Sequence, residues 1–258
     1  MSGRSRNLVI LGGLGQGMRM QVRTILVALA ALWALAAGGA AYAQYAPEAV
    51  RVMERARAAT GGAAWAKVAG VHELGAEEGF RHERWADPLR YGLRTDVAGP
   101  AGRVVRGYNG AGAWSLHPAG ADVSGEPAPD LKAARTDAYV AGYGYYFRSR
   151  FDARASYVGQ RRADGRAFEV VRAHPNGGSP RELWFDAKTG LLGRIVEAEG
   201  ARPVTVELSD YRKVGALTVP FRFVTMGGGL ARPRTRVLET VRFEPVDRAL
   251  FSLPARAP

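Results

Sequence analysis

The sequence contains no cysteine, and it has lysine at only four positions, 67, 132, 188 and 213. The first absence excludes disulfides, thiolate metal ligands, a cysteine nucleophile and a lipid anchor on a cleavage-site cysteine. Because lysine is so scarce, almost all of the basic residues are arginines. Apart from one N-terminal segment, no apolar run approaches the length of a membrane-spanning helix.

Motifs of familiar catalytic centres are also missing. The sequence has no G-x-S-x-G elbow, S-x-x-K, H-E-x-x-H, P-loop or aspartic-protease D-[ST]-G pattern. Asp164-Gly165 and Asp186 to Gly190 are better explained as hairpin turns. We therefore expect no catalytic residue, no metal site and no cofactor. The alternative is an unrecognised hydrolase with a Ser-His-Asp arrangement drawn from distant strands.

Histidine is scarce, and its four positions carry no metal-binding spacing. His72 and His82 each precede a glutamate, but neighbouring residues of a strand point to opposite faces. Ligands would have to be gathered from several strands, which spacing alone does not show. We expect surface or half-buried histidines at the following positions: His72, His82, His117 and His174.

The N-terminal segment has the three parts of an export signal. Arg19 and Arg23 precede an apolar run over residues 24–37, and Ala41-Tyr42-Ala43 forms an A-x-A cleavage site. We predict a signal peptide over residues 1–43 and a mature periplasmic domain over residues 44–258, with an uncleaved anchor as the alternative. The start codon stays open between Met1, Met18 and Met20.

The charge is strongly positive: +12 for the whole chain and +8 once the four arginines of residues 1–43 are removed. Basic surfaces attract nucleic acids, anionic membranes and acidic proteins. Export weighs against nucleic acid, and the arginines are scattered along the chain without forming basic runs. The remaining possibilities are an anionic membrane surface, an acidic protein partner, or plain solubility for a protein expected to be monomeric.

The mature sequence reads as one short helix followed by an antiparallel meander. Residues 47–59 favour a helix that begins with proline, ends at Gly61-Gly62 and buries Ala49, Val50, Met53 and Ala56. From Val71 onward, apolar and polar residues alternate, as a sheet with one buried face requires. Roughly nine to eleven strands are expected. Turn signals separate them at Asn109-Gly110, Asp164-Gly165, Asn176-Gly177, Thr189-Gly190 and Glu199-Gly200.

One helix interrupts the meander. A small, polar and proline-rich loop over residues 119–130 leads into a predicted helix from Leu131 to about Phe147. Helical spacing would place Tyr139, Tyr143 and Tyr146 on one face. That face serves either core packing or the lining of a ligand site. Gly142 and Gly144 weaken the helix near its end.

Most of the mature sequence resembles the superfamily of LolA- and LolB-like carriers, which sort lipoproteins to the outer membrane. The resemblance rests on these segments: Leu183-Trp184-Phe185-Asp186, Thr189-Gly190-Leu191-Leu192, Asp210 to Gly215 and Val219 to Phe223, with Ala59-Thr60-Gly61-Gly62, Trp65 and the closing Asp247, Leu250-Phe251 and Pro254. It implies a mainly β (α+β) fold, an unclosed and strongly curved antiparallel half-barrel whose helices cover an apolar cavity.

The resemblance also implies a non-catalytic carrier of lipoprotein acyl chains or other lipidic ligands. Its motif positions are structural, so the ring set of the cavity comes from strand parity and the tyrosine stripe. It contains Trp85, Tyr91, Trp114, Tyr139, Tyr143, Tyr146, Trp184, Phe221 and Phe223. The alternative is an interaction or envelope-sensing module in which the same rings fill the core.

Overall fold

The computed structural model describes residues 44–118, 130–197, 199 and 202–254. These residues belong to one compact unit. The predicted signal peptide and most of the predicted loop over residues 119–130 lie outside the described residues.

The unit contains two α-helices, three short 3-10 helices and twelve strands in the described ranges. The helical elements are α2 (Pro47–Ala59), η1 (Gly62–Lys67), α3 (Leu131–Ala141), η2 (Gly144–Tyr146) and η3 (Arg248–Phe251). The strands are β1 (Val71–Glu77), β2 (Phe80–Asp87), β3 (Gly92–Gly99), β4 (Gly102–Asn109), β5 (Ala113–Leu116), β6 (Ala153–Ala163), β7 (Arg166–Pro175), β8 (Arg181–Asp186), β9 (Leu192–Glu197), β10 (Val204–Val214), β11 (Leu217–Gly227) and β12 (Arg234–Arg242).

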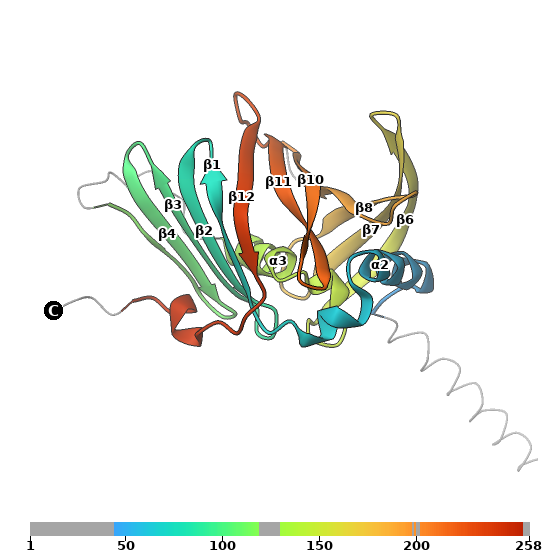
Figure 1. The fold of residues 1–258 in the computed structure, drawn as a ribbon, viewed down its shortest axis with the longest axis horizontal. Helices are drawn as coiled ribbons and strands as arrows, with labels where there is room; N and C mark the ends of the chain where they lie inside the picture. Colours follow the sequence, from blue (N-terminus) through green and yellow to red (C-terminus); the bar gives the residue numbers. More distant parts are fainter. Residues whose placement is uncertain (1–43, 119–129, 198, 200–201, 255–258) are drawn as a thin grey trace, which may run out of the picture. The chain divides into compact units, whose positions relative to one another are not determined.

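All twelve strands belong to one antiparallel sheet, which curves strongly and does not close (Figure 1). The order is β5-β4-β3-β2-β1-β12-β11-β10-β9-β8-β7-β6, so sequence neighbours pair throughout except where β1 meets β12. That single long-range pairing joins the two halves of the meander. The half-barrel expected from the family resemblance is confirmed, with one strand more than the upper end of the expected range.

The extra strand is explained by turns that the sequence signals missed. Glu78-Gly79 connects β1 to β2 with positive φ at both residues (51° and 85°), the conformation of a tight hairpin turn. Glutamate is a rare choice for that conformation, so the turn is not recognisable from sequence. Asp164-Gly165, which also has positive φ at both residues (48° and 72°), connects β6 to β7 as predicted.

Helix α2 has the predicted bounds, begins with Pro47 and packs beside β6 and β7. Its buried face differs by one residue from the expected one: Val52 is buried with Ala49, Met53 and Ala56, while Val50 is half-buried. Val52 lies three residues from Ala49 and four from Ala56, which is the spacing of one helix face.

Helix α3 is shorter than predicted. Asp130 caps its first turn by accepting hydrogen bonds from the amides of Lys132 and Ala133. The helix ends at Ala141, and Tyr143 then takes a left-handed conformation with φ of 54°. The expected helical face of three tyrosines is therefore wrong. Close packing fixes the path after the helix, because a Cβ at Gly144 would lie 2.3 Å from the Tyr139 ring.

Helix α3 lies inside the curve of the sheet. It contacts β2, β3 and β4 from one arm of the half-barrel and β7 from the other arm (Figure 1). Because these strands are separated in the sheet order, a single helix touches both arms only by crossing the concave side. The concave face and α3 therefore enclose the interior of the unit.

An aromatic cluster closes one end of this interior around Trp65, which is fully buried. Its ring centroid lies 5.0 Å from Tyr143 and 4.8 Å from Tyr146. Its indole Nε1 donates a hydrogen bond to Thr60 Oγ1 at 3.0 Å, and that hydroxyl donates to the Ala56 carbonyl at 2.8 Å. Thr60 and Trp65, which contributed to the family resemblance, therefore pack α2 against the segment after α3.

Candidate functional site

A cavity of about 320 Å³ lies between the concave face of the sheet and the segment around α3. Its apolar wall is formed mainly by β9, β10 and β11. The apolar lining residues are Leu93, Val140, Tyr143, Tyr145, Ile195, Val204, Val206, Leu208, Pro220 and Phe223. Residues 204–208 follow the alternation predicted from Val71 onward, since the three apolar side chains of that segment share this wall.

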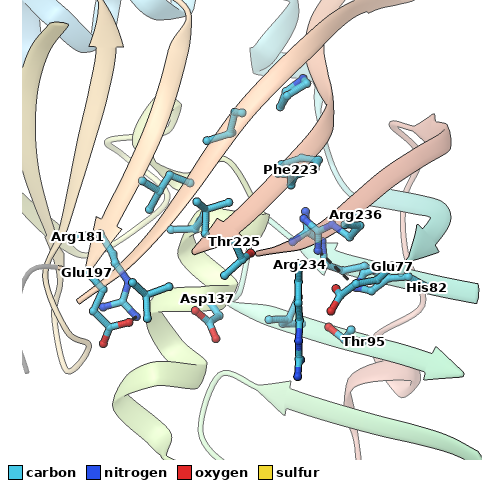
Figure 2. A pocket seen from close by; sticks show the side chains of 18 of the residues that line it. Glu77, His82, Thr95, Asp137, Arg181, Glu197, Phe223, Thr225, Arg234 and Arg236 are labelled. Carbon is cyan, nitrogen blue, oxygen red and sulfur yellow. Dashed lines mark hydrogen bonds and ion pairs between the residues drawn. The ribbon is translucent and has the colours of Figure 1, made fainter. Parts of the chain in front are cut away.

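The rest of the lining is polar and largely charged. These residues are Glu77, His82, Arg84, Thr95, Asp137, Arg181, Glu197, Thr225, Arg234 and Arg236. Figure 2 shows them in two groups, with Arg181, Glu197 and Asp137 on one side and Arg234, Arg236, Glu77 and His82 on the other. The cavity is therefore an apolar channel with charged groups at its two ends.

The first charged group contains one ion pair. Arg181 Nη2 lies 3.0 Å from Glu197 Oε2, which joins the start of β8 to the end of β9. Asp137 of α3 lines the same side and adds a second carboxylate. This end of the cavity therefore has one arginine for two acidic groups.

The second charged group includes an ion pair on the concave face. Arg84 of β2 and Glu73 of β1 face each other across the strands, with 2.6 Å between Nη2 and Oε2. Glu73 is fully buried, and its Oε1 has no hydrogen-bond partner in the described part of the chain. A buried carboxylate of this kind depends on its cation, because losing the partner would leave a charge in a low-dielectric environment.

Arg236 lies beside this ion pair without a carboxylate of its own. Its guanidinium carbon is 4.3 Å from the ring centroid of Phe223, and Nη1 is 3.4 Å from His82 Nε2. Burial and the nearby charge of Arg84 lower the pKa of Arg236 to about 10. The guanidinium still carries its charge at neutral pH, in a setting that disfavours it.

His82 is 2% exposed and faces these arginines from β2. Burial, together with the charges of Arg236 and Arg84, lowers its pKa from 6.5 to about 3. The ring is therefore neutral at any physiological pH. The expectation of a surface or half-buried histidine is wrong for His82, because its ring lies in the cavity lining beside Arg236.

The neutral state of His82 predicts a loss of stability in acid. Between pH 6.5 and 3 the unfolded chain protonates this histidine and the folded chain does not, so the free energy of unfolding falls as the pH falls through that window. We expect the drop between pH 7 and 4.5 to be about 2 to 3 kcal/mol smaller in His82→Gln than in the parent protein. Urea denaturation at both pH values measures it.

The control is His174→Gln, which removes a half-buried histidine of β7 outside the cavity lining. Its acid sensitivity should match that of the parent. An equal drop in His82→Gln and the parent would contradict the assignment of a neutral, buried ring.

Of the nine rings that the sequence placed around a cavity, Tyr143 and Phe223 line this one. Four others are buried in the core next to it: Tyr91, Tyr139, Tyr146 and Phe221. The three tryptophans lie elsewhere. Trp85 stacks on His72 with 5.0 Å between centroids, Trp114 donates to the Phe251 carbonyl at 2.9 Å, and Trp184 contacts the Phe168 ring edge-on at 5.8 Å.

Strand parity explains the position of two of these tryptophans. Trp85 follows Arg84, and Trp184 lies between Leu183 and Phe185, whose side chains are in the core. Alternation therefore sends both rings to the other face of the sheet. Sequence reasoning missed the charged lining because it placed aromatic residues inside and arginines outside.

No group of three or more His, Asp or Glu side chains that could hold a metal ion occurs in residues 44–118, 130–197, 199 and 202–254. In those same ranges, no helix combines the length and the hydrophobicity that a membrane span requires.

These features define a class of protein: an unclosed antiparallel half-barrel with a helix across its concave face and an amphipathic cavity beneath. No protein-family model matches the sequence, and no curated protein matches it. Three solved structures are similar to this chain.

The three structures are similar to this chain at low identity. A domain named for outer membrane lipoprotein sorting, from Vibrio parahaemolyticus, has 11% identity and a TM-score of 0.47 over 76% of this chain and 92% of that one. A DUF1329 family protein from Desulfovibrio piger has 9% identity and a TM-score of 0.47 over 78% and 96%. A LolA superfamily protein from Nitrosomonas europaea has 13% identity and a TM-score of 0.44 over 71% and 88%.

Proposed function

We propose that this protein is a non-catalytic periplasmic binding protein that holds one lipidic or other apolar group between the curved sheet and α3. The observation that carries the proposal is the continuous apolar wall of Val204, Val206 and Leu208 on β10, with Phe223 beside Leu208 on β11 and Tyr143 in the same cavity lining. These side chains pack against the protein on one side and line the cavity on the other. A hydrocarbon chain placed against them would bury apolar surface, which contributes about 25 cal/mol of binding free energy per Å².

The size of the cavity limits the ligand. Its volume of about 320 Å³ lies at the lower end of the range of roughly 300 to 1,000 Å³ that is typical of small-molecule sites. One acyl chain fits such a volume better than the several chains of a complete lipoprotein anchor. We therefore favour a ligand with a single chain, or one chain of a larger lipid.

The periplasmic location rests on the predicted signal peptide over residues 1–43. Within that compartment, the mature charge of +8 suits contact with an anionic membrane surface or an acidic partner, from which a lipidic ligand would be loaded. We propose that the protein acts there as a monomer, without nucleic acid or cofactor.

The test uses an uncharged fluorescent probe, N-phenyl-1-naphthylamine, whose emission rises in apolar surroundings. Val206→Trp, which inserts an indole into the cavity wall, should reduce probe affinity at least about tenfold, because a filled site no longer removes the probe from water. Fluorescence titration measures binding, and urea denaturation reports stability.

Val237→Trp is the matched control. It makes the same change on β12, two strands away in the sheet, at a side chain that is 37% exposed and outside the cavity lining. Probe binding should stay unchanged there. Absence of probe binding to the parent protein would sink the carrier proposal and leave the second possibility, an interaction module with a filled core, which the burial of Tyr91, Tyr139, Tyr146 and Phe221 favours.

A further inference from the structure

The cavity is electrically polarised along its length. At the end near β12, Arg84, Arg234 and Arg236 meet two carboxylates, Glu73 and Glu77. At the other end, Arg181 meets the two carboxylates of Glu197 and Asp137. The β12 end therefore has one positive charge in excess, whereas Asp137 interacts with Arg84 as well as with Arg181 and lies between the two ends.

The excess positive charge is held by arginines without partners. Arg84 is paired with Glu73, whereas Arg234 and Arg236 have no carboxylate within ion-pair distance in the described part of the chain. Glu77 is opposite Arg236 in the strand register but forms no ion pair with it. Arg236 Nε is buried and has no hydrogen-bond partner in the same part of the chain.

Arg236 is half-buried, and its buried Nε donor is costly unless an acceptor completes it. Arg236 is held in place by the Phe223 ring at 4.3 Å and by His82, a neutral ring that adds no competing charge. Thr95 lines the same end and offers a hydroxyl. Planar arginine donors match the oxygens of a carboxylate or phosphate.

We infer that the ligand is a single-chain amphiphile with an anionic oxygen head, a carboxylate or phosphate, which binds Arg236 and Arg234 while its chain lies along Val204, Val206 and Leu208. This inference rests on the proposed function, since it names the chemistry of the ligand held in the same cavity. The excess of arginine at the β12 end sets the direction of the chain, because it attracts the anionic head to that end.

The experiment compares ligands of one chain length by isothermal titration calorimetry at pH 7.5: decanoate, decyl phosphate, 1-decanol and decyltrimethylammonium. At least one anionic ligand should bind about ten to a hundred times more tightly than decanol, because charge-assisted hydrogen bonds are the stronger ones. The cationic ligand should bind more weakly than decanol. Acetate and inorganic phosphate test the head without the chain, and both should bind too weakly to detect.

Arg236→Gln should bring the anionic ligand to within about threefold of decanol, and Arg234→Gln should reduce its advantage in part. Arg212→Gln is the matched control: its guanidinium also lies over a phenylalanine, Phe221 at 4.6 Å, but it is paired with Asp210 outside the cavity lining. It should leave all affinities unchanged. Arg236→Lys keeps the charge and loses the planar donors, so an intermediate advantage is expected.

Equal affinity for anionic ligands and decanol in the parent protein would overturn the inference and leave the proposed function standing. This comparison needs no variant, so it remains valid if Arg236→Gln does not fold. Acetate or phosphate binding as tightly as the chain-bearing anions would also overturn it, because the chain would then contribute nothing. If neither the decyl ligands nor N-phenyl-1-naphthylamine binds, the proposed function itself fails.

Discussion

Arg84→Met should lower the free energy of unfolding by about 3 to 5 kcal/mol, because it leaves the carboxylate of Glu73 buried without a cation. Glu73 is fully buried, and the arginine side chain is 16% exposed. Although burial lowers the pKa of Arg84, the neighbouring carboxylate raises it above its ordinary value. A loss of this size is a large part of the roughly 5 to 15 kcal/mol that stabilises a typical domain.

A double-variant cycle separates the loss of the pair from the burial of the charge. Glu73→Leu together with Arg84→Met removes both charges and should be clearly more stable than Arg84→Met alone, since apolar replacements of a buried pair are often nearly neutral. Urea denaturation at pH 7 measures each variant. Arg81→Met is the control: this arginine of the same strand is 64% exposed and pairs with Glu83, so a loss of at most about 1 kcal/mol is expected.

If Arg84→Met and Arg81→Met were equally stable, Glu73 would not depend on Arg84. The stability of the protein would then not depend on compensating the buried charge of Glu73. A double variant less stable than Arg84→Met alone would instead show that packing around the two side chains dominates their electrostatics.

The sheet could be predicted from the sequence because each strand and each turn is specified by residues that are close together in the chain. Alternation over residues 204–208 and 217–223, with two-residue turns such as Asp164-Gly165, specifies antiparallel neighbours without knowledge of the distant chain. The predicted helix over residues 47–59 was equally local, since proline and a glycine pair mark its ends. The helix has the expected bounds, the Asp164-Gly165 turn has the expected conformation, and Val204, Val206 and Leu208 share one wall of the cavity.

The cavity was not predictable in the same way. Alternation divides a strand into two faces but does not say which face is concave. Hydrophobicity would put Trp85 inside and Arg84 outside, and the structure does the reverse because Glu73 on the next strand supplies the counter-charge.

Pairing between strands that are distant in the sequence is the second reason why the cavity could not be predicted. Glu77 and Arg236 are opposite each other only because β1 pairs with β12 across most of the chain. No local pattern identifies that partnership. The end of α3 also depended on tertiary contact, since Gly144 lies against the Tyr139 ring.

Trp65→Ala should lower the free energy of unfolding by about 3 to 5 kcal/mol, the usual cost of removing a large buried aromatic side chain. The indole has no exposed surface and packs against Tyr143, Tyr146 and Phe147, with the Phe243 ring 5.8 Å away. These neighbours come from separate parts of the chain. A cavity at their meeting point cannot be filled by moving one side chain.

Trp65→Phe separates packing from hydrogen bonding. It keeps an aromatic ring but loses the donor to Thr60 Oγ1, so we expect a smaller loss of about 1 to 2 kcal/mol. The Thr60 hydroxyl still donates to the Ala56 carbonyl and is not left unpaired. Urea denaturation of both variants gives the two losses.

Trp85→Ala is the control on the outer face, where a half-buried indole is stacked on His72 at 5.0 Å. It should cost less than half of what Trp65→Ala costs, because less apolar surface returns to water. Trp65 is not part of the cavity lining, so Trp65→Phe should bind N-phenyl-1-naphthylamine as the parent does. Equal losses for the two tryptophan-to-alanine variants would contradict the role of Trp65 as the residue on which α2 and the segment after α3 pack together.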